Sequence, residues 1–543
     1  MIALGYHDRT KHHFSRFARS LGYLDWATQP DPFRRYEGSA LVELPRVALA
    51  DEVPYSALFD GTVAPAPIDQ QSIGEFLRCS MGLSAWKQYG HSRWALRVNP
   101  SSGNLHPTEA YVVHDGRIFH YAPREHALEE RCVFDQEAWR RLMGTPDAAF
   151  LVALTSIHWR EAWKYGERAF RYCQHDVGHA LGALRLAGAM LGWQVTLLPE
   201  WSDRDLGRLL GVDRDADFSQ AEREEPDCMA IVGAPAHAAR LAPDPSALLS
   251  ATTDGSWHGV ANRLSAGHVE WPAIDEVAEA TRYPGGERYG SATVRGAMVQ
   301  TATPPQGRSI APSHPRTIAL PNAREIMLSR RSAVAFDGRG TLPRNWFFSM
   351  LRRLRPPGPP WDAIDWPPHV HLVLFVHRVE GLDPGIYAYL RDDEVLAEWR
   401  SAMRQEFLWE RSNDPNLFLL VPVDCGPTAM RLSCDQDIAA EGFFSLAMVA
   451  RVEASLRDQG EWFYRRLFWE CGVIGQVLYL EAEAAGGRAT GIGCFYDDPV
   501  HALLGLTGHA WQSLYHFSMG APIDDSRLTT EPGYAWETPV RAR

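Results

Sequence analysis

Two kinds of hydrophobic pattern alternate along the chain. The stretches 169–191 and 463–485 are rich in alanine and leucine at helical spacing, and each ends at a glycine of the kind that caps helices. Short runs of β-branched and aromatic residues, such as AYVVHDG, AAFLVALTSI, HLVLFVHRV and NLFLLVPV, are typical of strands. The sequence therefore predicts an α+β fold with two long helices.

The two long helices belong to an internal repeat. The segment HDVGHALGALRLAGAMLGWQ, which starts at His175, aligns without a gap with WECGVIGQVLYLEAEAAGGR, which starts at Trp469. The alignment places Gly178 over Gly472. Similarity at one constant offset indicates that a structural unit has been duplicated. We therefore predict two copies of one α+β unit.

Composition divides the rest of the chain. Residues 1–66 hold several aromatics and prolines without a clear period, and we expect an arm that wraps the domain. Residues 67–240 and 320–543 are the two copies. Between them, residues 241–319 are rich in Pro, Gly, Ser and Thr, which predicts a linker of irregular structure.

Charge and cysteine content narrow the classes of function. The 543 residues carry a formal net charge of −13, which argues against a nucleic acid as the main partner. The eight cysteines are scattered without a C-x-x-C pair, so we predict reduced thiols and neither a disulfide framework nor a zinc site. The apolar runs have the length of strands and are too short to span a membrane. We expect a soluble, cytoplasmic protein.

The segment RVNPSSGNLHPTE, from Arg97 to Glu109, precedes a predicted strand directly. Its turn offers backbone amides, two hydroxyls and an arginine, which together suit an anion or a polar ring edge. The same residue types also favour an ordinary surface loop, so composition leaves both interpretations open. His175 and His179 lie four apart on one helical face, but no H-E-x-x-H accompanies them and no metal site is predicted.

Four motifs together resemble a known family. They are Arg-x-x-Pro-Ser-Ser-Gly-x-Leu-x-Pro-x-Glu at 97–109, Lys164-Tyr165 before a long helix, Arg330-Arg331-Ser332, and Gly491-Ile492-Gly493. Their order and spacing resemble the nitroreductase superfamily, in particular its SagB or thiazoline-oxidase branch. The resemblance implies a nitroreductase-like fold that dimerises and binds FMN between two subunits.

The two copies are complementary in these motifs. The first has the Pro-Ser-Ser turn and the Lys-Tyr pair, the second has Arg-Arg-Ser and the glycine turn, and neither has both sets. We therefore predict that the chain folds into an intramolecular pseudo-dimer with one complete FMN site and one degenerate site. The residues expected to bind FMN are Arg97, Pro100, Ser101, Ser102, Asn104, Arg330, Arg331, Ser332, Gly491, Ile492 and Gly493.

The resemblance also implies roles for these residues. Arg97, Arg330 and Ser332 would bind phosphate and ribityl oxygens through charge-assisted bonds. The two serines and the asparagine of the first copy would face the ring edge or the ribityl chain. The backbone N–H of Gly493 would contact flavin N5, because glycine allows a close approach.

Lys164 and Tyr165 are the candidates for proton transfer. Oxidation of a C–N ring by hydride transfer also requires a proton to leave, and a desolvated lysine or a tyrosine can accept it. The alternative is that Tyr165 is a packing residue of a helix and that Lys164 only extends along it to solvent.

We expect an FMN-dependent oxidoreductase that removes two electrons from an azoline-like or peptide-derived heterocycle in natural product biosynthesis. The alternatives are an NAD(P)H-dependent reductase of nitro or quinone-type substrates, and a flavin-free scaffold subunit of a biosynthetic complex. The expected partners are a small-molecule or peptide substrate and biosynthetic partner enzymes. The expected assembly is a pseudo-dimeric monomer or a homodimer.

Overall fold

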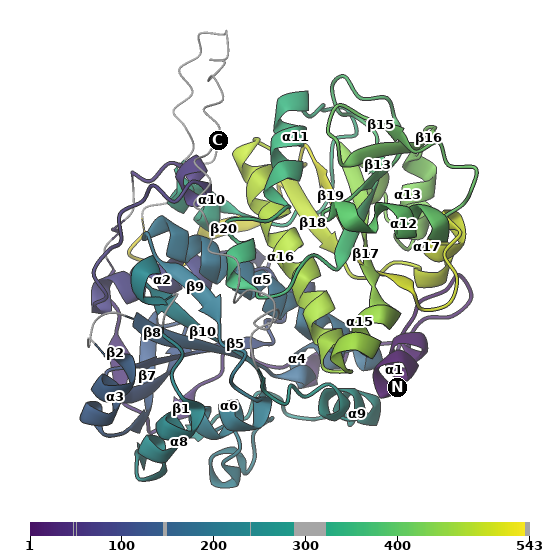
Figure 1. Ribbon diagram of the computed structural model, residues 1–543. Helices are drawn as coiled ribbons and strands as arrows, with labels where there is room; N and C mark the ends of the chain where they lie inside the picture. Colours follow the sequence, from purple (N-terminus) through teal and green to yellow (C-terminus); the bar gives the residue numbers. More distant parts are fainter. Residues whose placement is uncertain (47, 50–51, 145–148, 239–240, 287–321, 538–543) are drawn as a thin grey trace.

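The computed structural model describes residues 1–46, 48–49, 52–144, 149–238, 241–286 and 322–537. The chain forms two halves, each built on an antiparallel sheet, and a pair of long helices lies between them (Figure 1).

The sheet of the first half has the order β11-β7-β6-β5-β8-β10-β9, and β2 adds to β7. The inner strand β8, between β5 and β10, is buried along its whole length, as a strand covered on both faces should be. The strands are β2 (Leu41–Glu43), β5 (Thr108–His114), β6 (Arg117–Ala122), β7 (Ala127–Val133), β8 (Ala149–Ser156), β9 (Gln194–Leu197), β10 (Glu225–Gly233) and β11 (Ser256–Trp257).

The sheet of the second half has the order β15-β16-β14-β13-β17-β19-β18. Its run β14-β13-β17-β19-β18 repeats the run β6-β5-β8-β10-β9, and each neighbouring pair in both runs is antiparallel. The predicted duplication is confirmed. The strands are β13 (Val370–Val376), β14 (Gly385–Tyr389), β15 (Glu410–Arg411), β16 (Leu417–Pro422), β17 (Phe444–Arg451), β18 (Arg488–Ile492) and β19 (Trp511–Gly520).

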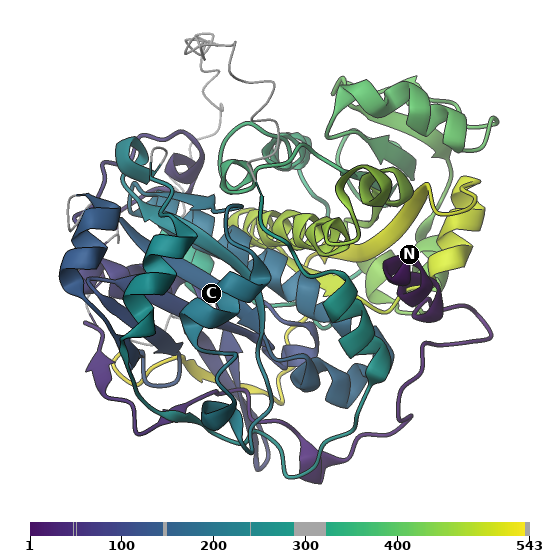
Figure 2. The ribbon, with the colours of Figure 1, turned by 60° about the horizontal axis from the view of Figure 1, so that its bottom comes forward.

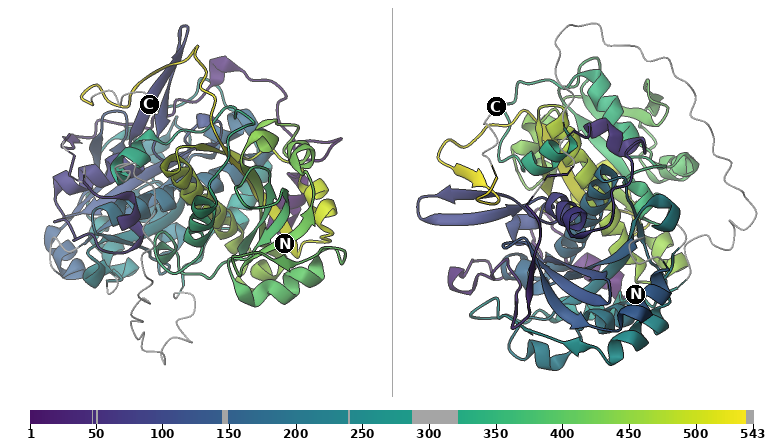
Figure 3. Two further views of the ribbon diagram at one scale, coloured as in Figure 1. Left: turned by 90° about the horizontal axis from the view of Figure 1, so that it is seen from above. Right: turned by 90° about the vertical axis from the view of Figure 1, so that its left-hand side faces the viewer.

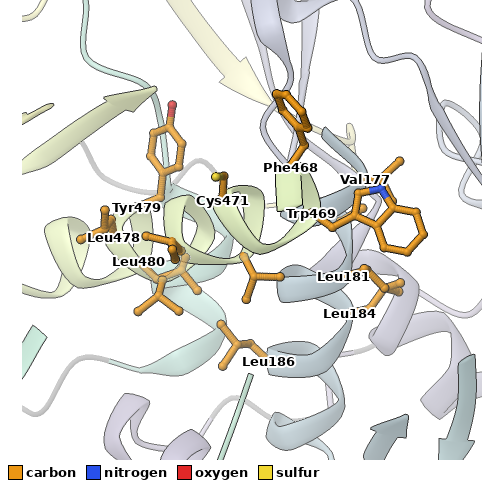
Figure 4. Close-up of a cluster of buried hydrophobic side chains, with 14 of the residues drawn as sticks. Val177, Leu181, Leu184, Leu186, Phe468, Trp469, Cys471, Leu478, Tyr479 and Leu480 are labelled. Carbon is orange, nitrogen blue, oxygen red and sulfur yellow. The ribbon is translucent and has the colours of Figure 1, made fainter. Parts of the chain in front are cut away.

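The two long helices are α5 (Ala169–Met190) and α16 (Phe463–Ala484), and they pack against each other. The second begins and ends 294 residues after the first (463 − 169 and 484 − 190). Every residue of α5 is buried, so a helix without a solvent-exposed face lies at the centre of the molecule. Figure 4 shows aliphatic side chains of α5 in one cluster with leucines and aromatics of α16, and the same core extends into both halves.

The repeat-related glycines face each other where these helices cross. A Cβ on Gly178 would lie 2.7 Å from the Cα of Trp469 and 2.8 Å from the Cα of Gly472. A Cβ on Gly472 would lie 2.7 Å from the Cα of Gly178. Real Cβ atoms do not approach backbone this closely, so the crossing requires glycine on both helices.

The N-terminal arm reaches the second half. It begins with α1 (Ile2–Arg9), and Figure 2 shows this helix against the second half. The His7 Nδ1 and the Tyr464 hydroxyl of α16 lie 3.0 Å apart in a hydrogen bond, and the backbone N–H of His12 donates to Asp497 at 2.8 Å. Farther along the arm, β1 (Tyr36–Glu37) pairs with β12 (Val260–Ala261). The arm therefore has more regular structure than its sequence suggested.

The C-terminal segment reaches the first half in return. Strand β20 (Thr529–Pro532) pairs with β3 (Leu83–Tyr89), which pairs with β4 (Ser92–Arg97). Figure 3 shows the β3–β4 hairpin projecting from the body with the yellow β20 beside it. The hydroxyl of Tyr534 donates to the Pro123 carbonyl at 2.6 Å and fixes the segment after β20.

The described part of the predicted linker is less irregular than expected. Residues 241–286 contain α8 (Pro245–Thr253) and α9 (Pro272–Ala280) as well as β11 and β12. Both helices start with proline at their first position, where its missing N–H costs nothing. Prolines that suggested irregular structure therefore begin helices. Residues 287–319 lie outside the described residues, and the boundaries 1–66, 67–240, 241–319 and 320–543 stay predictions.

Among the described residues, no helix combines the length and the apolar character that a membrane span requires.

The helix crossing generates a prediction about stability. G178A should lower the free energy of unfolding by about 1–3 kcal/mol, because the new methyl group overpacks against α16. The matched control is G5A in α1, where a Cβ meets nothing within 4 Å and alanine should be neutral or stabilising by up to ~1 kcal/mol. Urea unfolding followed by circular dichroism measures both. Equal stability of the two variants would contradict the assigned role of the crossing.

Candidate cofactor site

A cavity of about 400 Å³ lies where the two halves meet. Its walls come from the first half (Arg97, Pro100 to Asn104, His106, Tyr165, Tyr172, Asp176 and His179), from the second half (Arg330 to Ser332, Val334, Gln436, Tyr479, Thr490 to Cys494 and Tyr515), and from the projecting three-stranded region (Lys87, Trp94, Leu96 and Leu528). This size lies in the range of small-molecule and cofactor sites.

The cavity brings together every residue that the sequence predicted to bind a cofactor: Arg97, Pro100, Ser101, Ser102, Asn104, Arg330, Arg331, Ser332, Gly491, Ile492 and Gly493. Tyr165 also borders it. Lys164 does not line it, but its Nζ lies 3.1 Å from the position of a Cβ on Gly103. The roles of these residues stay predictions.

A larger depression of about 750 Å³ lies beside α11 (Arg344–Arg353). It contains none of the predicted residues and is a groove in the surface of one half. Size alone does not identify a site, and the smaller cavity between the halves is the candidate.

The turn from Pro100 to Asn104 is held rigidly in the cavity wall. The backbone N–H of His106 donates to the Ser101 hydroxyl at 2.8 Å, and the side-chain amide of Asn104 donates to the Ala95 carbonyl at 2.7 Å. Gly103 has φ +60, and a Cβ there would lie 2.6 Å from the Tyr165 hydroxyl. A glycine is therefore required, and the turn is part of a cavity and not an ordinary surface loop.

Two buried carboxyl groups lie under this turn, and sequence reasoning missed both. Glu161 is on α4 (His158–Tyr165), and Asp176 is on α5. The Ser101 hydroxyl donates to Glu161 at 3.4 Å, and the Ser102 backbone N–H donates to Asp176 at 3.2 Å. Burial raises the pKa of Asp176 to about 7, and burial followed by the charge of Asp176 raises the pKa of Glu161.

The pair therefore holds a proton near neutral pH, and its titration belongs to both groups. One signal in the sequence could have identified half of it: Asp176 is the only acidic residue of α5, a helix rich in alanine and leucine.

Positive charge gathers at the end of the cavity near the second copy's arginines. Burial, and then the adjacent Arg330, lower the pKa of Arg331 to about 9. Burial, and then Arg331 and Arg488, lower the pKa of Lys87. These cations repel one another in a poorly solvated place, which an anion would relieve. Lys87 was not predicted from the sequence, because only tertiary folding brings its strand to this end.

Arg97 differs from its expected role. Its guanidinium donates to the carbonyls of Thr108 at 3.3 Å and Pro32 at 2.5 Å, and it lies 4.0 Å from the carboxylate of Glu109. These partners hold Nη1 and Nη2, while Nε has no hydrogen-bond partner among the described residues. Arg97 therefore supports the wall of the cavity more directly than it offers charge to a phosphate.

The glycine turn of the second copy has a reason other than the one given from the sequence. A Cβ on Gly491 would lie 2.7 Å from Cζ of Tyr515, and a Cβ on Gly493 would lie 2.9 Å from Cδ1 of Tyr172 and closer still to its Cε1. The backbone N–H of Gly491 donates to the Tyr479 hydroxyl at 2.9 Å. Both glycines are needed because tyrosine rings occupy the space of their side chains, so close approach to a flavin is not the only explanation.

Lys164 and Tyr165 end α4 beside the turn. The Tyr165 ring packs edge-on against Tyr172 with centroids 4.5 Å apart, and the Lys164 Nζ lies 5.1 Å from the centroid of Tyr165. Burial raises the pKa of Tyr165. Tyr165 thus packs in the core and also borders the cavity, so both interpretations from the sequence describe part of its environment.

A family model described as the nitroreductase family matches residues 63–233 and 372–521, which together make up more than half of the chain. The chain belongs to the nitroreductase family. The predicted fold class, a nitroreductase-like α+β fold in two tandem copies, is confirmed.

Solved structures agree with this fold. A putative nitroreductase from Anabaena variabilis has 20% sequence identity and a TM-score of 0.66, and the match covers 96% of this chain and 99% of that chain. A putative nitroreductase from Ralstonia eutropha has 16% identity and a TM-score of 0.26, covering 37% of this chain and 94% of that chain. The E. coli microcin synthetase McbBCD complex has 15% identity and a TM-score of 0.25, covering 43% and 91%.

Of these three structures, only the Anabaena protein has a TM-score above 0.5. Its similarity supports the assigned fold over both copies of the repeat. No curated protein matches the sequence.

The nitroreductase repeat defines a second position related to the cavity. At the repeat offset, Leu197 and Pro199 replace Gly491 and Gly493, and Trp469 replaces His175. The space at this position is only about 20 Å³. Large side chains surround it, namely Trp201, Tyr283, Trp462, Arg465, Arg466 and Trp469. Of the two related positions, one is open and the other is filled.

The residues of the open cavity fit a flavin mononucleotide. The cationic end suits a dianionic phosphate, the serine and asparagine turn suits hydroxyl and ring-edge groups, and tyrosines offer apolar surface for a planar ring. Further donors are available, since the buried Nε of Arg97 and the Nδ1 of His179 have no hydrogen-bond partner among the described residues.

The buried carboxyl pair generates a prediction about pH. Because burial raises the folded-state pKa of Asp176 from 3.8 to about 7, the folded state keeps a proton that the unfolded state loses. This contribution to stability is present below the unfolded pKa and is lost as the pH rises towards 7. D176N removes the ionisation, so its stability relative to the wild type should rise over this range by up to ~1.4 kcal/mol per pH unit.

Urea unfolding at several pH values between about 4 and 7 tests this, with D213N at an exposed turn as control. A constant difference between D176N and the wild type would contradict the assignment of a buried, protonated pair.

Proposed function

We propose that this protein is an FMN-dependent oxidoreductase that binds one FMN per chain in the cavity between its halves. The observation that carries the proposal is the contrast between the open cavity of about 400 Å³, which contains the cationic cluster, and its repeat-related counterpart of about 20 Å³. When bound, the flavin would supply two-electron chemistry. The contrast also argues against a flavin-free scaffold, in which nothing would keep one position open and polar.

The cationic end would hold the phosphate. Arg331 and Lys87 would act through charge, and Ser332, which is exposed at the cavity edge, would add a hydroxyl. The Arg330 guanidinium donates to the Val98 carbonyl at 3.1 Å and to the Arg97 carbonyl at 2.9 Å. Arg330 would therefore join the two halves at the cavity and add positive charge to it.

The remaining predicted residues would surround the ring and the ribityl chain. The turn Pro100 to Asn104 would face them from the first half, and Gly491 to Gly493 would face them from the second half. The Gly493 N–H near flavin N5 stays part of this proposal.

Lys164 and Tyr165 would handle the proton of the reaction. Lys164 follows Glu161 by three residues on α4, so both side chains lie on the same face of the helix. Burial and then Asp176 raise the pKa of Glu161, and Lys164 partly opposes this rise. Lys164 would accept a proton from substrate as the neutral amine, or the Tyr165 phenol would relay that proton by passing its own proton on. The proton could then be held on the carboxyl pair, to which the Ser101 hydroxyl donates.

We assign the substrate to azoline-like or peptide-derived heterocycles, oxidised by two electrons with partner enzymes of a biosynthetic pathway. Support comes from the motif resemblance and from the cavity edge, where Trp94, Leu96, Val334 and Leu528 offer apolar surface beside Lys87. Reduction of nitro or quinone-type substrates with NAD(P)H is the alternative, and the anaerobic mixing experiment below distinguishes it from the proposed oxidation.

Flavin binding tests the proposed phosphate end. R331Q should weaken FMN binding about 10- to 100-fold, because a charge-assisted bond is worth about 1.5–3 kcal/mol. Its affinity for riboflavin, which has no phosphate, should stay unchanged. Fluorescence titration measures both, and R339Q at an exposed position is the control. Equal loss of both flavins would place the phosphate elsewhere, and two FMN per wild-type chain would overturn the single-site proposal.

Anaerobic mixing of the holoprotein with substrate tests proton transfer. A thiazoline-containing peptide should bleach the wild-type flavin, and K164M should slow the bleaching at least ~100-fold while keeping FMN bound, since general acid–base catalysis contributes that much. The control is R141M on the exposed face of α3 (Gln136–Met143). Bleaching by NADPH and not by the thiazoline would instead favour the reductase.

A further inference from the structure

Two cysteines 60 residues apart meet at the edge of the cavity. Cys434 lies between α13 (Gly426–Leu432) and α14 (Ile438–Glu441), and Cys494 lies between β18 and α17 (Asp497–Leu504). Their Sγ atoms are 2.9 Å apart, and Cys494 lines the cavity. A disulfide needs about 2.05 Å between the sulfurs, so closure requires them to move by less than an ångström.

Hydrogen bonds that do not involve the sulfur atoms hold the two segments together. The side-chain amide of Gln436 donates to the Cys494 carbonyl at 3.1 Å and to the Ser433 carbonyl at 2.6 Å. The Tyr496 N–H donates to the Leu432 carbonyl at 2.9 Å. Cys434 itself has φ +55, a conformation that non-glycine residues adopt only when their surroundings impose it. The proximity of the sulfurs therefore results from several contacts that do not involve sulfur.

The N-terminal arm adds a hydrogen-bond donor to the pair. The His12 side chain hydrogen-bonds to Cys494, and its Nδ1 accepts the Ala18 N–H at 2.9 Å, so the neutral ring carries its proton on Nε2. The Arg168 guanidinium donates to the Gly493 carbonyl at 3.2 Å and adds positive charge next to the thiol. The hydrogen bond with Cys434, then His12 and Arg168, lower the pKa of Cys494.

The titratable and charged groups that face Cys494 come from the arm, from α4, the turn Gly166–Arg168 and α5, from α17 and the residue before it, and from the turn after α13. They are His12, Tyr165, Arg168, Tyr172, Tyr496, Asp497 and Cys434. Asp497 is paired with Arg168 at 2.9 Å, and Arg168 still acts on Cys494.

We propose that Cys434 and Cys494 form a redox-active dithiol that small-molecule disulfides convert into an intramolecular disulfide. The Cys494 thiolate attacks one sulfur of the small disulfide, which forms a mixed disulfide and releases one thiolate. Cys434 gives up its proton, and its sulfur attacks Cys494 Sγ, which closes the intramolecular disulfide and releases the second thiolate. The proton that Cys494 lost on ionising and the proton of Cys434 go to the two released thiolates, so one small disulfide is reduced to two thiols.

The pair also acts on the cavity, and this part rests on the proposed function. A thiolate next to the ring position disfavours added negative charge on a reduced flavin, and closure of the disulfide removes that thiolate. Oxidation of the pair should therefore make the potential of a bound flavin more positive.

The test uses the reduced full-length chain and oxidised glutathione as the probe. After alkylation of the remaining thiols, peptide mass spectrometry should find Cys434 linked to Cys494, with two reactive thiols lost and both recovered by dithiothreitol. C434S should instead retain a glutathione adduct on Cys494. C228S, at a partly exposed cysteine of β10, should behave as the wild type.

The alkylation rate gives a second readout that needs no flavin. At pH 7, iodoacetamide should modify Cys494 about tenfold faster than Cys228, because burial raises the pKa of Cys228 while its surroundings lower that of Cys494. H12Q should move the midpoint of the Cys494 pH profile upward.

Absence of a linked Cys434–Cys494 peptide in the wild type, or equal alkylation of Cys494 and Cys228, would overturn the proposal. A protein that forms the disulfide but binds no FMN would keep the dithiol and refute only the proposed function.

Discussion

The close crossing of α5 and α16 at Gly178 and Gly472 is the contact on which the rest of the structure depends. Because neither helix has a side chain at this point, their backbones approach closely and every residue of α5 becomes buried. The two sheets then lie on either side of one shared core. Side chains farther along both helices, among them Tyr172 and Asp176 on α5 and Tyr479 on α16, become walls of the same cavity. The constraint that joins the halves thus also brings residues of both to one site.

The same crossing creates two equivalent positions, and side-chain volume decides which of them is open. At the open position the ring of His175, which is smaller than that of Trp469, stacks on Tyr515 with centroids 4.1 Å apart, and the cavity beside it stays unfilled. On the other side its repeat counterpart Trp469 donates to the Gln174 side chain at 2.7 Å and helps to fill the space. Arg466 stacks there over Trp462 and Tyr283, so a cation and aromatic rings occupy the place of a ligand.

Much of the fold and part of the candidate site could be predicted from the sequence. The repeat and the strand runs are local patterns, and motif order was enough to gather residues from both copies around one cavity. The carboxyl Glu161, the cation Lys87 and the Cys434–Cys494 pair were missed, because each gains its meaning from contacts between distant segments. The described part of the linker, residues 241–286, is more regular than predicted for a different reason: proline marks a helix start as well as irregular structure, and composition does not distinguish the two.

Fusion of the two copies in one chain explains how such asymmetry can exist. In a symmetric homodimer every substitution appears at both equivalent sites, so a tryptophan that fills one site also fills the other. In a single chain the halves can differ, and the terminal segments can differ with them.

The arm brings His12 to the second half, and β20 completes the hairpin sheet of the first half. Both additions lie on the side of the open cavity, where Leu528 before β20 and Cys494 beside His12 form part of its wall. The filled position therefore stabilises the core, while the open position keeps the polar groups that would be costly to bury without a ligand.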